Sequence, residues 1–299
     1  RCMKTPGGFL HGPDRRSYAE VSEADRLEFW ESLYASPGFG VWLGNFREVL
    51  MDKEINWEFS EFIANKIRAR VNNPDVAELL IPKDHGFGSR RVPMETFYYE
   101  AYNRPNVELV DLNAAPIERI TENGLKTTAA EYDFDVIVYA TGFDAITGAF
   151  DRIRFEGPDG QALKDKWEDC PVTYLGLQSA GFPNLVTLAG PQSGSVSTNF
   201  PRGIEEAVDW TTGLVRFMRE HGYQRVEANS DAEAEWTEHV KGLYDYGLAT
   251  TTKSWFTGYN SNVDGHDKLR YLVYFGGAPK YRERLSEIVD GGYEGFEFG

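Results

Sequence analysis

The chain has 299 residues, of which 41% are hydrophobic, enough for about two domains of about 100–150 residues with substantial cores. Its formal net charge of −16 argues against a nucleic-acid partner and against an anionic membrane surface. The two cysteines have no CxxC spacing and the five histidines are scattered, so we expect no metal site and no disulfide framework. No apolar run approaches the roughly 20 residues that span a bilayer, and no signal peptide begins the chain. We therefore expect a cytoplasmic protein.

Helical patterns dominate the first third of the chain, after a loop over residues 1–20. Residues 22–52 read as helix with a break at Ser36-Pro37-Gly38. A second helix is expected to begin at Asn56, as its N-cap, and to end near Val71. Asn73-Pro74 then begins a short helix that stops before Pro82.

The middle of the chain reads as strands, at about 107–110, 116–120 and 125–127. Asn123-Gly124 predicts a hairpin between the last two. The apolar, β-branched run Asp135–Ala140 predicts a parallel strand that is buried on both faces.

Small residues follow that last strand, in Ala140-Thr141-Gly142-Phe143-Asp144. They allow close approach of the backbone at the end of the strand where open α/β sheets bind ligands. The remaining expected elements, in chain order, are a buried strand Leu185–Ala189 ending at Gly190, a polar loop 191–199, a helix Pro201–Arg219, a helix from a capping box at Ser230–Glu233 to about Tyr244, a strand Leu269–Phe275 and a helix Pro279–Asp290. The expected fold class is α/β.

An arginine pair stands in the loop His85-Gly86-Phe87-Gly88-Ser89-Arg90-Arg91, with no acid close in sequence to neutralise it. The guanidinium fork suits phosphate or peroxide oxygens. The alternative is a surface pair bound to distant carboxylates. The residues of the loop leave both interpretations open.

The segment from Ile81-Pro82-Lys83 to Arg91, followed by Tyr98-Tyr99-Glu100, resembles the Baeyer–Villiger monooxygenases. The resemblance continues in family order through Phe134–Asp144, Trp167, Tyr174-Leu175-Gly176, Gly181–Leu185, Gly190–Ser195, Trp236, Ser254–Gly258 and Tyr293–Phe296. It implies a two-dinucleotide-binding flavoprotein architecture with FAD and NADP(H) as cofactors.

The resemblance also implies roles for individual residues. Arg91 corresponds to the active-site arginine, and Arg90 stands where the family usually has a lysine that contacts the NADP phosphate. Trp255 matches a residue that hydrogen-bonds the NADP ribose on a mobile loop, although as a plain loop tryptophan it also fits a core anchor. The other implied cofactor-binding residues are Thr141, Gly142, Asp144, Gln192 and Val196, and the implied substrate-pocket residues are Ser197, Thr198, Asn199 and Phe200.

Three fingerprints of the family do not occur in the chain: two GxGxxG turns and FxGxxxHxxxWP. The resemblance is thus to a carboxyl-terminal portion. It implies a helical insertion of the NADP domain over 1–86, the last strands of that domain over 87–143, and the carboxyl-terminal part of the FAD domain over 144–299. We expect an amino-terminal portion with the GxGxxG turns as a partner, as a separate chain or as further sequence.

The implied reaction is oxidation of a ketone to an ester or lactone with NADPH and O₂, this chain supplying the carboxyl-terminal part of the active site. Two alternatives stay open at this point. One is a flavin monooxygenase that oxidises nitrogen or sulfur. The other is an inactive fragment or assembly subunit, which the missing turns favour.

Overall fold

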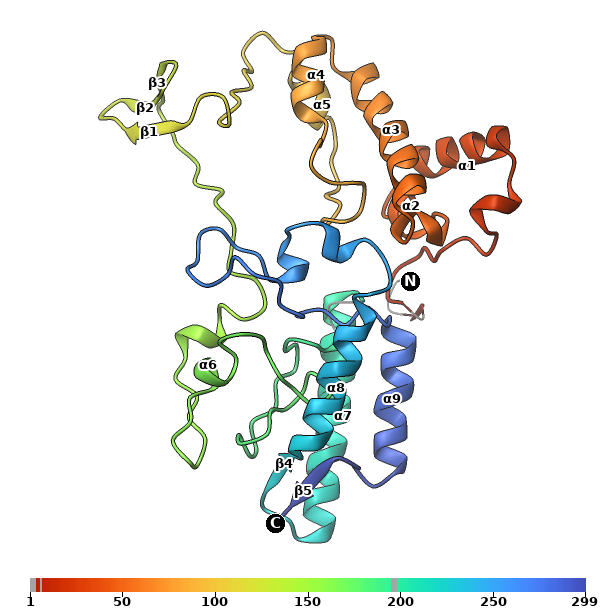
Figure 1. Ribbon diagram of the computed structural model, residues 1–299, viewed down its shortest axis with the longest axis vertical. Coiled ribbons are helices and arrows are strands. Elements are labelled where there is room, and N and C mark those ends of the chain that lie inside the picture. Colours follow the sequence, from red (N-terminus) through yellow and green to blue (C-terminus); the bar gives the residue numbers. More distant parts are fainter. Residues whose placement is uncertain (1–3, 6, 195–197) are drawn as a thin grey trace. The chain divides into compact units, whose positions relative to one another are not determined.

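The computed structural model describes residues 4–5, 7–194 and 198–299 (Figure 1). The chain divides into two compact units. The first unit contains the residues up to Asn56, the loop Phe87–Val92 and the residues from Asp144 onward, and the second contains Trp57–Gly86 and Pro93–Phe143. None of the helices in the described ranges is long and apolar enough to cross a membrane. The assignment of 1–86, 87–143 and 144–299 to parts of an NADP and an FAD domain stays a prediction.

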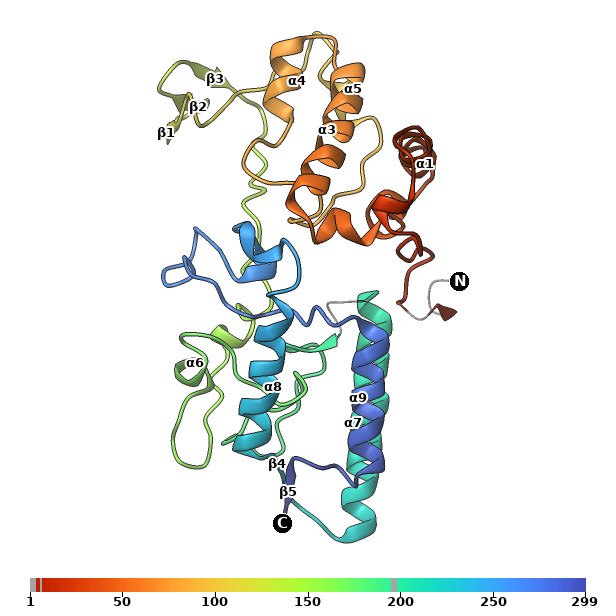
Figure 2. The same ribbon diagram turned by 45° about the vertical axis from the view of Figure 1, so that its right-hand side comes forward.

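Three helices carry the core of the first unit: α7 (Phe200–His221), α8 (Ser230–Leu243) and α9 (Ala278–Asp290). They run beside one another in both views (Figures 1 and 2), and their buried side chains belong to one cluster. The strands β4 (Val226–Ala228) and β5 (Phe296–Phe298) pair antiparallel. The expected helices 201–219, 230–244 and 279–290 are confirmed.

The first unit also contains α1 (Glu23–Ala35), α2 (Gly40–Leu43) and α6 (Leu163–Lys166). The predicted break after α1 is confirmed. α3 (Lys53–Arg70) begins earlier than expected, because Asp52 Oδ1 accepts hydrogen bonds from the backbone N–H of Glu54 (2.9 Å) and Ile55 (3.0 Å). The prediction of Asn56 as the N-cap is therefore wrong.

The capping box predicted at Ser230–Glu233 is also wrong. Asn229 is the N-cap of α8, since its side chain accepts from the backbone N–H of Asp231 at 2.8 Å. Glu233 is instead buried, where its carboxylate lies 2.8 Å from Lys166 Nζ and accepts from the N–H of Ala180 at 2.8 Å. Burial raises the pKa of Glu233, and the ion pair with Lys166 opposes that shift.

Removing this counter-charge should destabilise the protein in a pH-dependent way. Lys166→Met leaves Glu233 buried and unpaired, at a cost of about 3 kcal/mol near pH 8. The variant raises the folded-state pKa of Glu233 further above its unfolded value, so its stability falls as the pH rises through that pKa. The loss should therefore shrink toward about pH 4, where Glu233 is protonated in both states. Urea unfolding at both pH values measures this, and a pH-independent loss would contradict it. Lys241→Met, which removes an exposed pair with Glu238, is the control and should cost under about 1 kcal/mol.

The second unit combines short helices with a small antiparallel sheet. The rest of α3 packs with α4 (Pro74–Leu80) through apolar side chains, and α5 (Tyr98–Ala101) follows. Asn73 caps α4, as predicted. The strands β1 (Ile117–Ile120), β2 (Gly124–Thr127) and β3 (Glu131–Asp133) pair in that order, so the predicted Asn123-Gly124 hairpin is confirmed.

Four predicted strands do not form: 107–110, Asp135–Ala140, Leu185–Ala189 and Leu269–Phe275. The Asp135–Ala140 run is exposed rather than buried, with Val136 76% and Val138 81% exposed. A buried parallel strand needs neighbours that take its N–H and C=O groups, and the described strands pair only within β1–β3 and β4–β5. The 269–275 segment is largely buried, but loops supply its partners: Leu272 C=O accepts from Gln192 N–H, and Val273 N–H donates to Tyr244 Oη.

Candidate active site

The guanidinium of Arg91 lies over two aromatic rings. Its Cζ is 5.1 Å from the ring centroid of Trp42 and 5.5 Å from that of Phe39, within cation–π range. No carboxylate in the described ranges forms an ion pair with Arg91. Partial burial lowers the pKa of Arg91, but arginine stays charged in proteins. The interpretation of Arg91 as one of a pair neutralised by distant carboxylates is therefore not supported within these ranges. Arg90 is exposed beside it.

The backbone of the arginine loop is held at three points. The buried Asn56 side chain donates to Phe87 C=O at 2.9 Å. Gly88 has φ +78° and packs under the Trp42 indole, where a Cβ would stand 3.0 Å from Nε1. Ser89 is buried, and its Oγ accepts from Thr252 Oγ1 at 2.9 Å. Only the two arginine side chains of this loop's end are left exposed.

Trp255 lies at the start of a 3-10 turn, Trp255–Thr257, and is half-buried. It packs, together with Trp42, against a small cluster of Phe256, Leu272 and Val273. Trp42 thus connects the Arg91 guanidinium with the cluster that supports Trp255. Sequence analysis did not identify Trp42, because its place beside Gly88 depends on the tertiary structure alone.

Gln192 uses its polar atoms inside the protein. It is 0% exposed, its Oε1 accepts from Thr173 Oγ1 at 2.8 Å, and its Nε2 donates to Pro171 C=O at 2.7 Å. Its backbone has a positive φ of +65°, and its N–H donates to Leu272 C=O at 2.8 Å. Gln192 therefore fixes the beginning of the Gly190–Asn199 loop.

The end of that loop is only partly described. Thr198 is buried and its Oγ1 donates to Gly7 C=O at 2.7 Å. Asn199 is half-buried at the N-cap position of α7, and Phe200 is exposed. Val196 and Ser197, predicted beside the flavin and substrate, lie outside the described residues.

The residues predicted at the end of the 135–140 segment separate into two groups. Thr141 and Gly142 belong to the second unit and are exposed. Asp144 belongs to the first unit, where its Oδ1 lies 3.1 Å from His266 Nδ1 and 3.3 Å from Asn260 Nδ2. The Asp144 carboxylate thus has protein partners.

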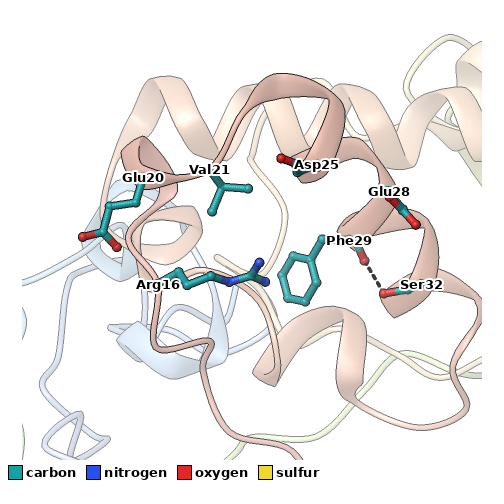
Figure 3. Close-up of a pocket in the computed structure, with 7 residues that line it drawn as sticks. All are labelled: Arg16, Glu20, Val21, Asp25, Glu28, Phe29 and Ser32. Carbon is teal, nitrogen blue, oxygen red and sulfur yellow. Dashed lines mark hydrogen bonds between the residues drawn. The ribbon is translucent and has the colours of Figure 1, made fainter.

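A surface pocket lies elsewhere in the first unit and contains none of the predicted site residues (Figure 3). Arg16 points into it toward the Phe29 ring, with its Cζ 5.0 Å from the ring centroid. Unlike Arg91, Arg16 has an acidic partner, Asp14, at 2.9 Å. Its charge is therefore largely neutralised.

No family model matches the chain. Individual relatives match nearly all of it. The 2-oxo-Δ³-4,5,5-trimethylcyclopentenylacetyl-CoA monooxygenase of Pseudomonas putida is 45% identical over 293 residues, 98% of this chain and 54% of the relative. The cyclopentanone 1,2-monooxygenase of Comamonas sp. is 41% identical over 283 residues, 94% and 51% of the two proteins. A Baeyer–Villiger monooxygenase of Pseudooceanicola batsensis is 32% identical over 287 residues, 96% and 51%.

This chain is homologous to the carboxyl-terminal portion of the Baeyer–Villiger monooxygenases. A crystal structure of OTEMO in complex with FAD and NADP superimposes with a TM-score of 0.93 at 44% identity, covering 100% of this chain and 55% of that one. The family resemblance and the α/β flavoprotein architecture expected from the motifs are confirmed. The chain spans about half the length of the Baeyer–Villiger monooxygenases that it matches.

Proposed function

We propose that this chain supplies the carboxyl-terminal part of the active site of a flavin-dependent Baeyer–Villiger monooxygenase. The enzyme converts a ketone to an ester or lactone with NADPH and O₂. The observation that carries the proposal is Arg91, a cation without a carboxylate partner in the described ranges, placed over aromatic rings in the loop that matches the family. The similarity to cyclopentanone 1,2-monooxygenase supports the substrate class.

The residues present fit FAD and NADP(H). Beside Arg91, Trp42 Nε1 is a buried donor with no hydrogen-bond partner in the described ranges. In the Gly190–Asn199 loop the Ser193 hydroxyl is likewise buried without a partner there. Unpaired buried donors and a fixed cation suit ligands rich in phosphate and carbonyl oxygen. When bound, the flavin supplies the activation of O₂ and NADPH the reducing equivalents.

Arg91 holds its positive charge where negative charge develops on oxygen during attack on the ketone carbonyl. The charge is preorganised, since Asn56, Gly88 and Ser89 fix the backbone of the loop. We assign Arg90 to the NADP phosphate and Trp255 to the NADP ribose.

The other predicted residues take two kinds of role. Thr141 and Gly142 stay proposed contacts of the cofactor. Asp144, Gln192 and Thr198 have protein partners for their side chains, so we assign them to shaping the cofactor and substrate sites. Asn199 and Phe200, with Val196 and Ser197, remain the proposed wall of the substrate pocket.

We further propose an amino-terminal portion as partner. In the second unit, Val136, Val138 and Tyr139 lie on an extended run without a partner strand, and Phe143 follows it. Strands from an amino-terminal portion would pair with this run and cover its apolar side chains. The length of the relatives, about twice the matched part, supports this proposal.

The test is product analysis in the complete flavoprotein with a cyclic ketone, NADPH and ¹⁸O₂. A visible absorption spectrum first establishes that flavin is present. The expected product is a lactone with one labelled oxygen atom and one equivalent of NADPH consumed. Oxidation of an amine or sulfide without any lactone from a panel of ketones would reject the proposal.

A further inference from the structure

Three ionisable side chains meet beside the Trp255 loop, which we define as Ser254–Arg270. His266 Nδ1 lies 3.1 Å from Asp144 Oδ1 and 3.3 Å from Arg270 Nη2. We propose that Asp144, His266 and Arg270 are positioning residues that anchor the Trp255 loop to the segment beginning at Asp144, and so set how firmly Trp255 is presented to NADP(H). The second half of this inference rests on the proposed function.

The anchor is buried, which makes it costly to disturb. Arg270 is 3% exposed and His266 8% exposed. Burial lowers the pKa of Arg270, and the negative charges of Asp144 and Asp151 oppose that shift. A buried cation keeps its charge only where such partners are held in place. The position of Arg270 in the loop is therefore coupled to the position of Asp144.

Further contacts close the loop on itself around this anchor. Arg270 N–H donates to Thr257 C=O at 2.9 Å, and Asn260 N–H donates to His266 C=O at 2.8 Å. Gly258 has φ +78°, and a Cβ there would stand 2.7 Å from the Cβ of Arg270. The two ends of the loop thus touch, and its inner side chains reach Asp144.

The chemistry of the groups favours an anchor over a cation site. Ligand atoms of Asp144, Asp151 and His266 lie within 4.8 Å of one another, as in some metal sites. However, Arg270 Nη2 already brings a positive charge within 3.3 Å of His266 Nδ1, so a cation at this point would be repelled. The carboxylates are therefore assigned as charge partners of Arg270.

The test compares Asp144→Asn with Asp267→Asn in the complete flavoprotein. Asp267 is an exposed aspartate next to His266, so the control makes the same chemical change on the same loop. Amide hydrogen exchange is measured for 254–270 and for α8, without NADP(H). We expect Asp144→Asn to speed exchange in the loop by about tenfold or more while α8 is unchanged, because local opening becomes easier than global unfolding. The control should change neither.

His266→Gln provides the second variant if Asp144→Asn does not fold, and Arg270→Lys tests conservative rescue of the charge. Unchanged loop exchange in the folded variants would overturn the anchor. NADP(H) affinity is then measured separately and should weaken about tenfold in Asp144→Asn and in Trp255→Ala, with flavin content retained. Faster loop exchange with unchanged affinity in both variants would support the anchor and reject the cofactor role of Trp255, so the two failures are distinguishable.

Discussion

Arg91→Ala should abolish lactone formation in the complete flavoprotein while flavin stays bound. Removal of a preorganised donor that stabilises developing charge costs about 10²–10³ in rate, or about 3–4 kcal/mol. The side chain can be removed without harm to the fold, because Arg91 is partly exposed and forms no ion pair in the described ranges. The measurement is the initial rate of lactone formation, with flavin content determined from the visible spectrum.

Arg16→Ala is the matched control for this experiment. Arg16 also lies over an aromatic ring, that of Phe29, but its charge is paired with Asp14. Its loss should leave the rate within about twofold, as expected for an exposed salt bridge. Arg91→Lys keeps the charge without the planar fork and should recover part of the rate. Lactone formation at the unmodified rate by Arg91→Ala would exclude Arg91 from the chemistry.

Gln192→Leu should lower the free energy of unfolding by about 3 kcal/mol. The substitution leaves the Pro171 carbonyl and the Thr173 hydroxyl buried without their partner, and each unsatisfied group costs about 1–3 kcal/mol. The midpoint of chemical unfolding measures the change. Gln192→Glu should also destabilise, since a carboxylate oxygen would then face the Pro171 carbonyl oxygen.

The control is Gln224→Leu, at an exposed position, which should change the stability by less than about 0.5 kcal/mol. A similarly small effect at Gln192 would show that the amide is not what holds the loop. If Gln192 fixes the floor of the flavin site as proposed, the variant should also lose flavin on gel filtration at concentrations where the unmodified protein keeps it.

Local patterns in the sequence predicted the helices and the hairpin well. Asn73-Pro74 begins α4 and Asn123-Gly124 joins β1 to β2, because caps and turns depend on residues adjacent in the chain. The misassigned caps at Asn56 and Ser230 have the same origin: Asp52 and Asn229 compete for the same N–H groups, and the sequence does not rank the competitors.

The strand predictions failed where a segment depends on distant partners. The Asp135–Ala140 run has the composition of a buried parallel strand, but a strand forms only against neighbours, and none of the described strands pairs with it. The 269–275 segment is buried as expected, yet loop and side-chain groups take its hydrogen bonds.

The sequence by itself determined the family, the α/β class and the arginine loop, since these follow from residue types in a fixed order along the chain. Only the tertiary structure decided that Trp42 and Phe39 cradle Arg91, that Gln192 spends its amide on Pro171 and Thr173, and that Asp144 faces His266. Each of these contacts joins residues far apart in the chain. Burial and pairing at such distances arise from packing of the whole unit, which no local pattern encodes.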